Sequence, residues 1–555
     1  MNMRTISLTS LLPATVLLCS SILSLPAQAF CGFYAGKADA SLFNRASQVI
    51  LARDEDRTVI TMQNDYQGPL SEFVLVVPTP QAIKQGQVKI ADKEVFARLD
   101  AYTAPRLAEY HEKAPECNFS FDWGKQFVAD NTVKVFGKAI RRYITNEMSM
   151  PAQTVQRGSI ANPAAVKVEA RFTLEEYDIV SLSAQESSSL ESWLLQNGYR
   201  LPPGAAAALQ PYIRQGMKFF AAKVNLKEKE RLGFNYLRPL QFAFQSPKYM
   251  LPLRLGMLNA QAGSAQDLIV YALSPHGRVE AANYRTAKLS TNQELPYFIK
   301  ERFADVYKSY FERQVKQDEM RTVYTEHYWR NEWRFMCDPC VETPPEVKHW
   351  QQAGVFWLND SKKEFAARIS GQAIVEADAN KLTPVAITRL HLRYNAESFP
   401  EDLVLSETRD QENWQVRHVI HHPQYGALQK CIAVLEQKHR CSDECEPRVS
   451  KVIALQNSGR ASSWRHQTAP VWQAECERAC HVAKQDSFRP IINYFQKDVA
   501  QRLEREKQTL ANLSGWSMAQ IEALPGAQEN LLHQGMPKTG KASPAPTQIA
   551  GKNGR

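Results

Sequence analysis

Beyond its first thirty residues the sequence lacks a long apolar run, and no later stretch approaches the ~18 apolar residues that cross a membrane as a helix. It also contains no G-x-S-x-G, H-E-x-x-H, Walker or G-x-G-x-x-G motif, which leaves out the commonest hydrolase, zinc-protease and nucleotide-binding signatures. No segment repeats with a fixed period. Catalytic groups can still assemble from distant positions. The sequence therefore gives no support for an enzymatic activity, but it does not exclude one.

A strong charge of one sign is missing as well. The formal net charge is +9 over 555 residues, and the basic residues are spread along the chain. A nucleic-acid-binding face needs basic residues clustered on one surface, so we expect no nucleic-acid partner. The sequence gives no reason to expect a cofactor.

The N-terminal segment is typical of a signal peptide. Arg4 precedes an apolar stretch at residues 11–25, and an Ala-Gln-Ala sequence ends at Ala29. We expect cleavage after Ala29, so residues 1–29 are not expected to contribute to the mature fold. Neither nearby cysteine follows the small residue of a lipoprotein signal. The mature chain is therefore expected to be a soluble periplasmic or secreted bacterial protein without a transmembrane anchor.

Residues 47–80 predict the strands around which the rest of the chain is organised. Apolar, β-branched and aromatic residues gather at 49–51, 58–62 and 73–77, as in half-buried strands. The charged run at 53–57 predicts a hairpin tip between the first two. We expect these three strands to begin a sheet on which later segments pack.

Later segments show both strand and helix patterns. Residues 385–394 alternate Leu and Tyr with Arg and His, which is typical of a strand with one apolar face. Residues 94–111 and 296–319 follow a helical period, the first with a kink or break at Pro105. We predict an α+β fold of mixed, largely antiparallel sheets with packed helices, plus a mainly helical, disulfide-stapled C-terminal region.

The character of the chain changes near residue 424. We expect an α+β body at 30–424, with a division into two subdomains near 200–235 as an option. A helical, cysteine-rich extension follows at 425–534. The tail at 535–555 is rich in Pro, Gly, Lys and Ala and is expected to be disordered.

Nine of the ten cysteines remain once Cys19 is removed with the signal peptide. In an oxidising compartment they are expected to form disulfides, and an odd number leaves one over. Cys31 and Cys117 form one candidate pair, which would tie the mature N-terminus to a loop. Cys431 is then the odd cysteine, either as a buried free thiol or as one that pairs with another molecule.

The sequence Cys337-Asp-Pro-Cys340 is the sharpest motif. Cys-x-Pro-Cys occurs at the redox centre of thioredoxin-like proteins, where a helix N-terminus lowers the pKa of the first thiol. Here Pro344 and Pro345 follow too closely for a long helix to begin at Cys337. We favour a local structural disulfide and keep a thiol–disulfide exchange site as the alternative.

Two C-x3-C pairs, Cys441/Cys445 and Cys476/Cys480, lie in predicted helices. Residues four apart share one helix face, so two antiparallel helices can be joined by the bridges Cys441–Cys480 and Cys445–Cys476. The alternative is a zinc site made by the four thiolates, with His481 as a further candidate ligand. An oxidising compartment favours the bridges, and we expect no bound metal.

Three further groups of polar residues are candidate sites. His418, His421 and His422 have no carboxylate cluster beside them in the sequence, so a solvated or hydrogen-bonded trio is favoured over a metal site. Asn64-Asp65-Tyr66 lies at a strand end, where Asn and Asp also start turns. The acidic turn from Glu397 to Asp402 has no partner motif that would complete a catalytic carboxylate pair.

Several long motifs, in order along the chain, resemble the DUF2330 family of exported bacterial proteins. They are CGFYAGKADASLFNRASQVILARD, VITMQNDYQG, LRPLQFAFQSPKYMLPLRLGMLNA, DLIVYALS, CDPC and RLHLRYNAESFPEDLVLSET. The resemblance covers residues 31–423 and resumes near Phe495. It implies export but supplies no reaction, substrate or catalytic residue. The cysteine-rich stretch at 431–481 looks like an elaboration beyond the family pattern.

The leading hypothesis is a non-enzymatic exported protein that binds an unknown protein or a component of the cell envelope and is stabilised by disulfides. It follows from the abundance of structural cysteines and the lack of a catalytic constellation. A periplasmic thiol–disulfide oxidoreductase using Cys337 and Cys340 is the second hypothesis. An unrecognised hydrolase is the third.

Overall fold

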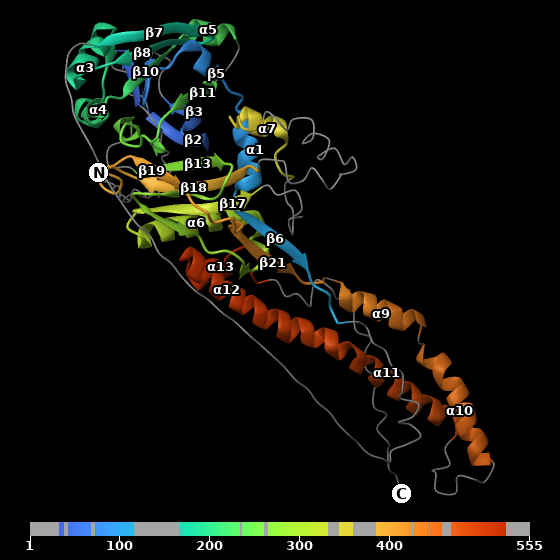
Figure 1. Cartoon of the computed structure of the whole chain (residues 1–555). Helices are drawn as coiled ribbons and strands as arrows, with labels where there is room; N and C mark the ends of the chain where they lie inside the picture. Colours follow the sequence, from blue (N-terminus) through green and yellow to red (C-terminus); the bar gives the residue numbers. More distant parts are fainter. Residues whose placement is uncertain are drawn as a thin grey trace, which may run out of the picture.

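The computed structural model describes residues 33–37, 43–67, 73–115, 166–232, 236–259, 265–330, 343–358, 384–424, 426–438, 440–457 and 468–528. These residues form a body of mixed sheets and helices, from which a helical arm projects (Figure 1). The predicted α+β class is confirmed, because most strand pairs in the sheets are antiparallel and helices pack on their faces.

The largest sheet of the body has nine strands and is built around a hairpin. Its central pair, β2 and β3, turns at the predicted charged tip, where Glu55 has a φ of 48°. Strand β13 lies parallel to β2, while the pairs β13–β18 and β18–β17 are antiparallel. In sheet order, the strands are β15 (Arg285–Lys288), β17 (Thr322–Arg330), β18 (Ala386–Tyr394), β13 (Gln266–Ser274), β2 (Phe43–Asp54), β3 (Arg57–Gln67), β11 (Leu240–Gln245) and β5 (Val88–Ile90), with β20 (Trp414–Gln415) beside β17.

A six-stranded antiparallel sheet packs against the nine-stranded sheet. The rings of Phe220 and Phe242, one from each sheet, stack with centroids 5.1 Å apart in the shared core. The strands in order are β7 (Lys167–Leu174), β8 (Tyr177–Ser183), β10 (Lys218–Val224), β4 (Phe73–Thr79), β1 (Phe33–Lys37) and β9 (Tyr199–Arg200). The expectation that residues 47–80 begin one sheet is therefore wrong, since β4 belongs to this second sheet.

Two small sheets and several helices complete the body. One small sheet joins β12 (Met250–Leu251), β19 (Leu403–Glu407) and β14 (Val279–Ala281), and the other, all parallel, joins β16 (Gln293–Leu295), β21 (Arg417–His422) and β6 (Arg106–His111). The helices are α1 (Glu94–Thr103), α3 (Ser187–Gln196), α4 (Ala205–Arg214), α5 (Leu226–Arg231), α6 (Phe303–Gln317), α7 (Val347–Gln352), α12 (Ala500–Ser514) and α13 (Met518–Glu522), with short 3-10 turns at Gln85–Gln87, Gly256–Asn259 and Tyr297–Arg302.

The helices cover the outer faces of the sheets. Helices α1 and α7 pack on the nine-stranded sheet, and α3 and α4 pack on the six-stranded one. Helix α6 packs with α12, α13 and the small parallel sheet. The helical period at 94–111 ends at Pro105, after which the chain continues as β6, because proline breaks a helix and the residue before it favours an extended backbone.

The arm comprises residues 427–499. Its elements are α9 (Ala427–Lys438), α10 (Cys441–Asn457), α11 (Ala469–Asn493) and a π-helical turn (Tyr494–Val499). Helix α11 runs through this turn directly into α12, so one long helical path connects the arm to the body (Figure 1). No helix in the described parts of the chain is both long and apolar enough to cross a membrane.

Candidate functional site

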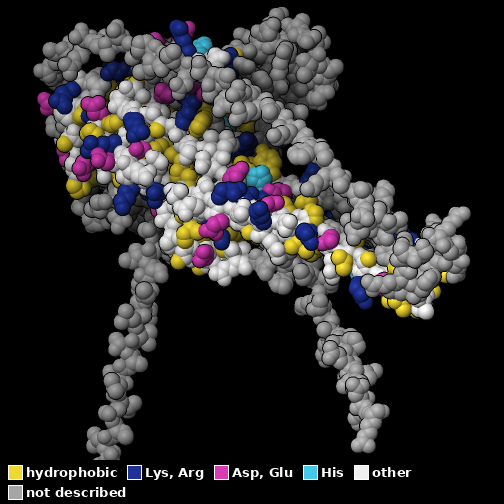
Figure 2. All heavy atoms as spheres, turned by 90° about the horizontal axis from the view of Figure 1, so that it is seen from below, with side chains coloured by type: hydrophobic (Ala, Val, Ile, Leu, Met, Phe, Trp, Pro, Cys, Tyr) yellow, Lys and Arg dark blue, Asp and Glu magenta, His cyan; other side chains and the backbone are white. Residues whose placement is uncertain are grey.

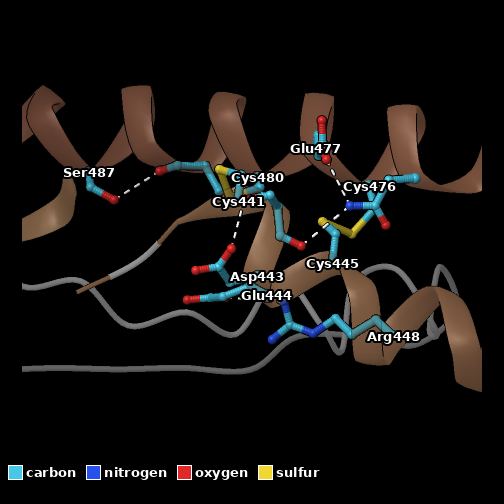
Figure 3. Close-up of a disulfide and its surroundings, with 12 residues drawn as sticks. Cys441, Asp443, Glu444, Cys445, Arg448, Cys476, Glu477, Cys480 and Ser487 are labelled. Carbon is cyan, nitrogen blue, oxygen red and sulfur yellow. Dashed lines mark hydrogen bonds and ion pairs between the residues drawn. A yellow bond between two sulfur atoms is a disulfide. The ribbon is translucent and has the colours of Figure 1, made fainter. Parts of the chain in front are cut away.

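Two disulfides hold the arm together near its far end. Cys441 bonds to Cys480 and Cys445 to Cys476, with Cα–Cα distances of 5.7 and 5.8 Å. The spacing of four places each pair on one helix face, so the bridges lie side by side between α10 and α11 (Figure 3). These are the bridges that the sequence predicted. All four thiols are used in them, which leaves none for the alternative zinc site.

The hairpin made by α10 and α11 has almost no apolar core apart from its cysteines. Among its described residues, the buried ones around the bridges are the four cysteines and Val449, with Trp472 and Ile453 partly buried beside them. Ile491, which is buried near the root of α11, packs in a separate cluster with α9. Two helices with so little buried apolar area are not held together by packing alone. The disulfides therefore replace a hydrophobic core in this part of the arm.

The outer face of α11 carries exposed valines. Val471 and Val482 are 44% and 53% exposed, and eleven residues, about three helical turns, separate them. They therefore share a face that lies opposite Cys480, with Glu475 and Arg478 between them. We call this face, Val471, Glu475, Arg478 and Val482, the valine stripe. Hydrophobic side chains reach the surface near the end of the arm in Figure 2.

The root of the arm is fixed to the body by a hydrogen bond from Tyr494 of the arm to Glu112 and by the apolar packing of Ala114 against the arm. Glu112, just after β6, accepts hydrogen bonds from Tyr494 and Arg502. Arg502 also pairs with the buried Glu506 at 3.0 Å. Burial raises the pKa of Glu506 to about 7, against the opposing pull of Arg502. The root is thus tied to the body by specific contacts, in contrast to the sparsely packed far end.

The three predicted histidines lie on β21, as expected for a strand, but in different surroundings. His418 is 1% exposed between the rings of Phe303 and Tyr310, and burial lowers its pKa to about 4. His422 accepts or donates a 2.8 Å hydrogen bond with Glu109 and stacks on His111. Within the described residues, no group of histidines, cysteines and carboxylates could hold a metal ion.

A buried charged network lies on the outer face of the nine-stranded sheet between α1 and α6. Glu326 is the extra residue of a β-bulge in β17, and its carboxylate is fully buried. Its Oε2 accepts from Arg389 Nε at 2.5 Å, and its Oε1 lies 2.6 Å from His391 Nδ1. Arg389 Nη1 donates to Asp100 at 2.5 Å and to Tyr271 at 3.2 Å.

The network is closed on itself. Tyr307 of α6 also donates to Glu326, so both carboxylate oxygens are occupied by protein donors. Burial alone would raise the pKa of Glu326, but the charges of His391 and Arg389 outweigh it and hold the pKa at about 2. A carboxylate that is charged at neutral pH and fully paired links helices to a sheet and is poorly suited to move protons.

The sequence pattern did not predict this network, because it marks a polar face of the strand and not what packs on that face. The alternation at residues 385–394 assigned Arg389 and His391 to a polar face. That face is covered by α1 and α6, so its charges are buried and paired instead of solvated. The imidazole of His391 stacks on Phe311 at 3.8 Å. Only the presence of two helices over the strand, which the alternation does not report, distinguishes the two cases.

The acidic turn at 397–402 has a structural role at its last residue. Asp402 Oδ1 accepts a 2.6 Å bond from Tyr212 and backbone N–H bonds from Leu253 and Arg254. Burial raises the pKa of Asp402 against these hydrogen bonds. Asp402 thereby links α4 to the loop after β12. Asn64, Asp65 and Tyr66 lie at the end of β3, paired with β2.

The remaining candidate cysteines lie mostly outside the described residues. These are Cys31, Cys117, Cys337 and Cys340, so both the Cys31–Cys117 pair and the redox motif stay predictions. Cys431 of α9 is described, and it is disulfide-bonded and 1% exposed. The expectation that Cys431 is the odd cysteine, as a buried free thiol or one that pairs with another molecule, is therefore wrong. The other described cysteines bond to each other, so its partner lies outside the described residues.

These observations define an α+β protein of packed mixed sheets that carries a disulfide-linked helical arm. The chain belongs to the DUF2330 family, described as an uncharacterized protein conserved in bacteria, whose family model matches residues 25–406. The predicted resemblance is thus confirmed over most of the body. No curated protein and no solved structure matches the chain. The match ends before the arm begins at Ala427.

Proposed function

We propose that the protein is a non-enzymatic binding protein of the bacterial cell envelope, exported with a cleaved signal peptide, and that its arm contacts a partner protein. The proposal rests on the structure of the arm, from its contacts with the body to its far end. It is rooted firmly in the body, whereas its far end is held by two disulfides and presents the valine stripe.

Protein partners recognise such surfaces through exposed apolar side chains set among charged ones. Three of the six large hydrophobic residues that are strongly exposed in the described structure, Val434, Val471 and Val482, lie on the arm. The two disulfides support the proposed export, since disulfides persist in oxidising compartments. The closed network around Glu326 supports a non-enzymatic role, because its charged groups are used in internal contacts.

The test places charges on the valine stripe. The double variant Val471→Glu/Val482→Glu leaves the bridges intact and is expected to abolish partner binding, because it puts carboxylates into an apolar contact. Val168→Glu/Leu195→Glu is the control, since these body residues are 43% and 52% exposed. Sedimentation of the full chain in native envelope extracts measures the complex.

We expect the wild type and the control variant to sediment as a complex and the stripe variant to sediment alone. A wild type that sediments alone, or a stripe variant that still sediments as a complex, would reject the proposal. N-terminal sequencing of the same material checks the export step, with Phe30 as the expected first residue.

A further inference from the structure

An apolar cavity of about 200 Å³ opens between the two large sheets of the body. It lies where β4 of the six-stranded sheet faces β3 and β11 of the nine-stranded sheet, and the loop between β11 and β12 closes one side. Such junctions between packed layers are common places for ligand pockets. The lining residues are Ile60, Val77, Pro78, Pro80, Gln215, Met217, Phe242, Phe244, Ser246, Pro247, Lys248, Met250 and Pro252.

The walls of the cavity are apolar and stiff. Four of the thirteen lining residues are prolines, which have fixed φ angles and no N–H group to leave unsatisfied. Ile60, Val77 and Phe242 are nearly fully buried and belong to the core shared by the two sheets. The cavity is therefore formed before any ligand arrives, which lowers the entropy cost of binding.

One cation lies at the edge of this apolar space. Lys248 is exposed, and its Nζ donates a 2.9 Å hydrogen bond to Gln215 Oε1, another lining residue. An ammonium group has three donors, so this bond leaves capacity for an anionic oxygen. A ligand that enters the cavity with an apolar body can therefore place a negative head group against Lys248.

We propose that this cavity binds a small amphipathic carboxylate, with its hydrocarbon part between the sheets and its carboxylate against Lys248. An apolar cavity of about 150 Å³ accepts benzene, so this cavity accommodates an acyl chain or ring of roughly six to eight carbons. Burial of the hydrocarbon supplies the affinity, and the charge of Lys248 selects an acid over a neutral analogue. The inference does not depend on the arm or on its partner.

Calorimetric titration of the full mature chain with octanoate and with 1-octanol tests this inference. Octanoate is expected to bind at one site, with 1-octanol roughly two- to fivefold weaker. Lys248→Gln should reduce octanoate affinity to the level of 1-octanol and leave 1-octanol unchanged. Lys89→Gln is the matched control, because Lys89 lines a different cavity, of about 350 Å³, and does not line this one.

Substitutions that fill the cavity are the second part of the test. Met250→Trp and Phe244→Trp each place a larger ring in the cavity at a half-buried position and should abolish binding of both probes. Binding that survives both substitutions would show that the probes bind elsewhere. Equal affinity for the acid and the alcohol, unchanged by Lys248→Gln, would overturn the assignment of a carboxylate ligand. No binding of either probe to the wild type would overturn the inference as a whole.

Discussion

At the scale of single residues, buried charges on β18 stabilise the body. The strand pattern alone would suggest that these charges face solvent. Arg389 and His391 alternate with leucines, so the sequence predicts the strand and its two faces correctly. It cannot predict that α1 and α6 cover the polar face, because alternation reports which residues share a side and not what packs against that side. The bulge that directs Glu326 into this contact carries no sequence signal either.

Glu326→Gln tests the energetic importance of the network. Removing one partner of a buried ion pair leaves the other charge uncompensated, so we expect a loss of about 3–5 kcal/mol in the free energy of unfolding. Urea unfolding followed by tryptophan fluorescence measures it. Glu412→Gln is the control, since Glu412 is 74% exposed in its pair with Lys288 and should cost under about 1 kcal/mol.

The pH dependence of the same variant follows from linkage. Because the pKa of Glu326 is lowered from 4.5 to about 2, its stabilisation is complete above pH 4.5 and is lost as the pH falls toward 2. The difference in stability between wild type and Glu326→Gln should therefore shrink across that window. A difference that is constant from pH 6 to pH 2.5, or equal effects of the two substitutions, would contradict the assignment.

His418 also makes stability fall on acidification, but because burial disfavours its charged form. Its pKa falls from 6.5 to about 4, so between these values the unfolded chain binds a proton that the folded chain does not, and stability falls on acidification. Neither of its ring nitrogens has a hydrogen-bond partner in the described structure. His418→Phe should therefore be about 2 kcal/mol more favourable at pH 5 than at pH 8.

Unfolding midpoints at the two pH values measure this difference for His418→Phe. His276→Phe is the control, because the His276 side chain is 68% exposed on a turn. The same pH effect in both variants would show that burial of His418 is not its source.

At the scale of elements, spacing predicted the arm better than the body. Cysteines four residues apart fix both the helix face and the two bridges, and the structure has that pairing. The sheets were less predictable, because the sequence of a hydrophobic strand does not determine which strand it pairs with. Strand β4 follows β3 directly in the chain but belongs to the other large sheet. Strand β13 pairs with β2, although more than two hundred residues separate them in the chain.

The two bridges of the arm are nested, so their effects should not add. Each closes a loop, of 39 and 31 residues in sequence separation, worth about 4 kcal/mol alone in the entropy model. With one bridge present, the other closes only short additional segments. We expect Cys445→Ser/Cys476→Ser to leave the hairpin nearly as stable as the wild type, and removal of all four cysteines to open it.

Limited proteolysis read by mass spectrometry measures opening of the hairpin, and cleavage should be confined to α10 and α11 while the body stays intact. Cys441→Ser/Cys480→Ser is the matched control, because it removes the other bridge and shows whether the result depends on which bridge is kept. Equal protease sensitivity after loss of one bridge and of both would contradict the nested arrangement.

Cys431 offers a prediction about the remaining bridges. Ala114 packs in the same apolar cluster as Cys431, and its N–H donates to Gln424 at 2.9 Å. Cys117 follows Ala114 by three residues, which reach about 10 Å when extended. We therefore expect a Cys117–Cys431 bridge, which would leave Cys31 without the partner that the sequence suggested. Digestion without reductant, after alkylation, identifies the pair, and a Cys31–Cys117 peptide would refute it.

At the scale of the whole molecule, the protein combines a well-packed body with an arm whose far end depends on disulfides (Figure 1). The body matches a bacterial family and holds the cavity near Lys248, whereas the arm lies beyond the matched residues. A long helical path through the π-helical turn joins the two parts. This arrangement suits a protein that holds one surface at a distance from its body, for a partner in the envelope.

The most direct test of that claim is photo-cross-linking in the native bacterium. A photoreactive amino acid is introduced into the full chain at Val471 or Val482 on the valine stripe, and at Val168 or Leu195 on the body, all similarly exposed. The account predicts one discrete cross-linked species from the stripe positions and none from the body positions. Adducts from the body alone, or from neither region, would contradict a partner-binding role of the arm.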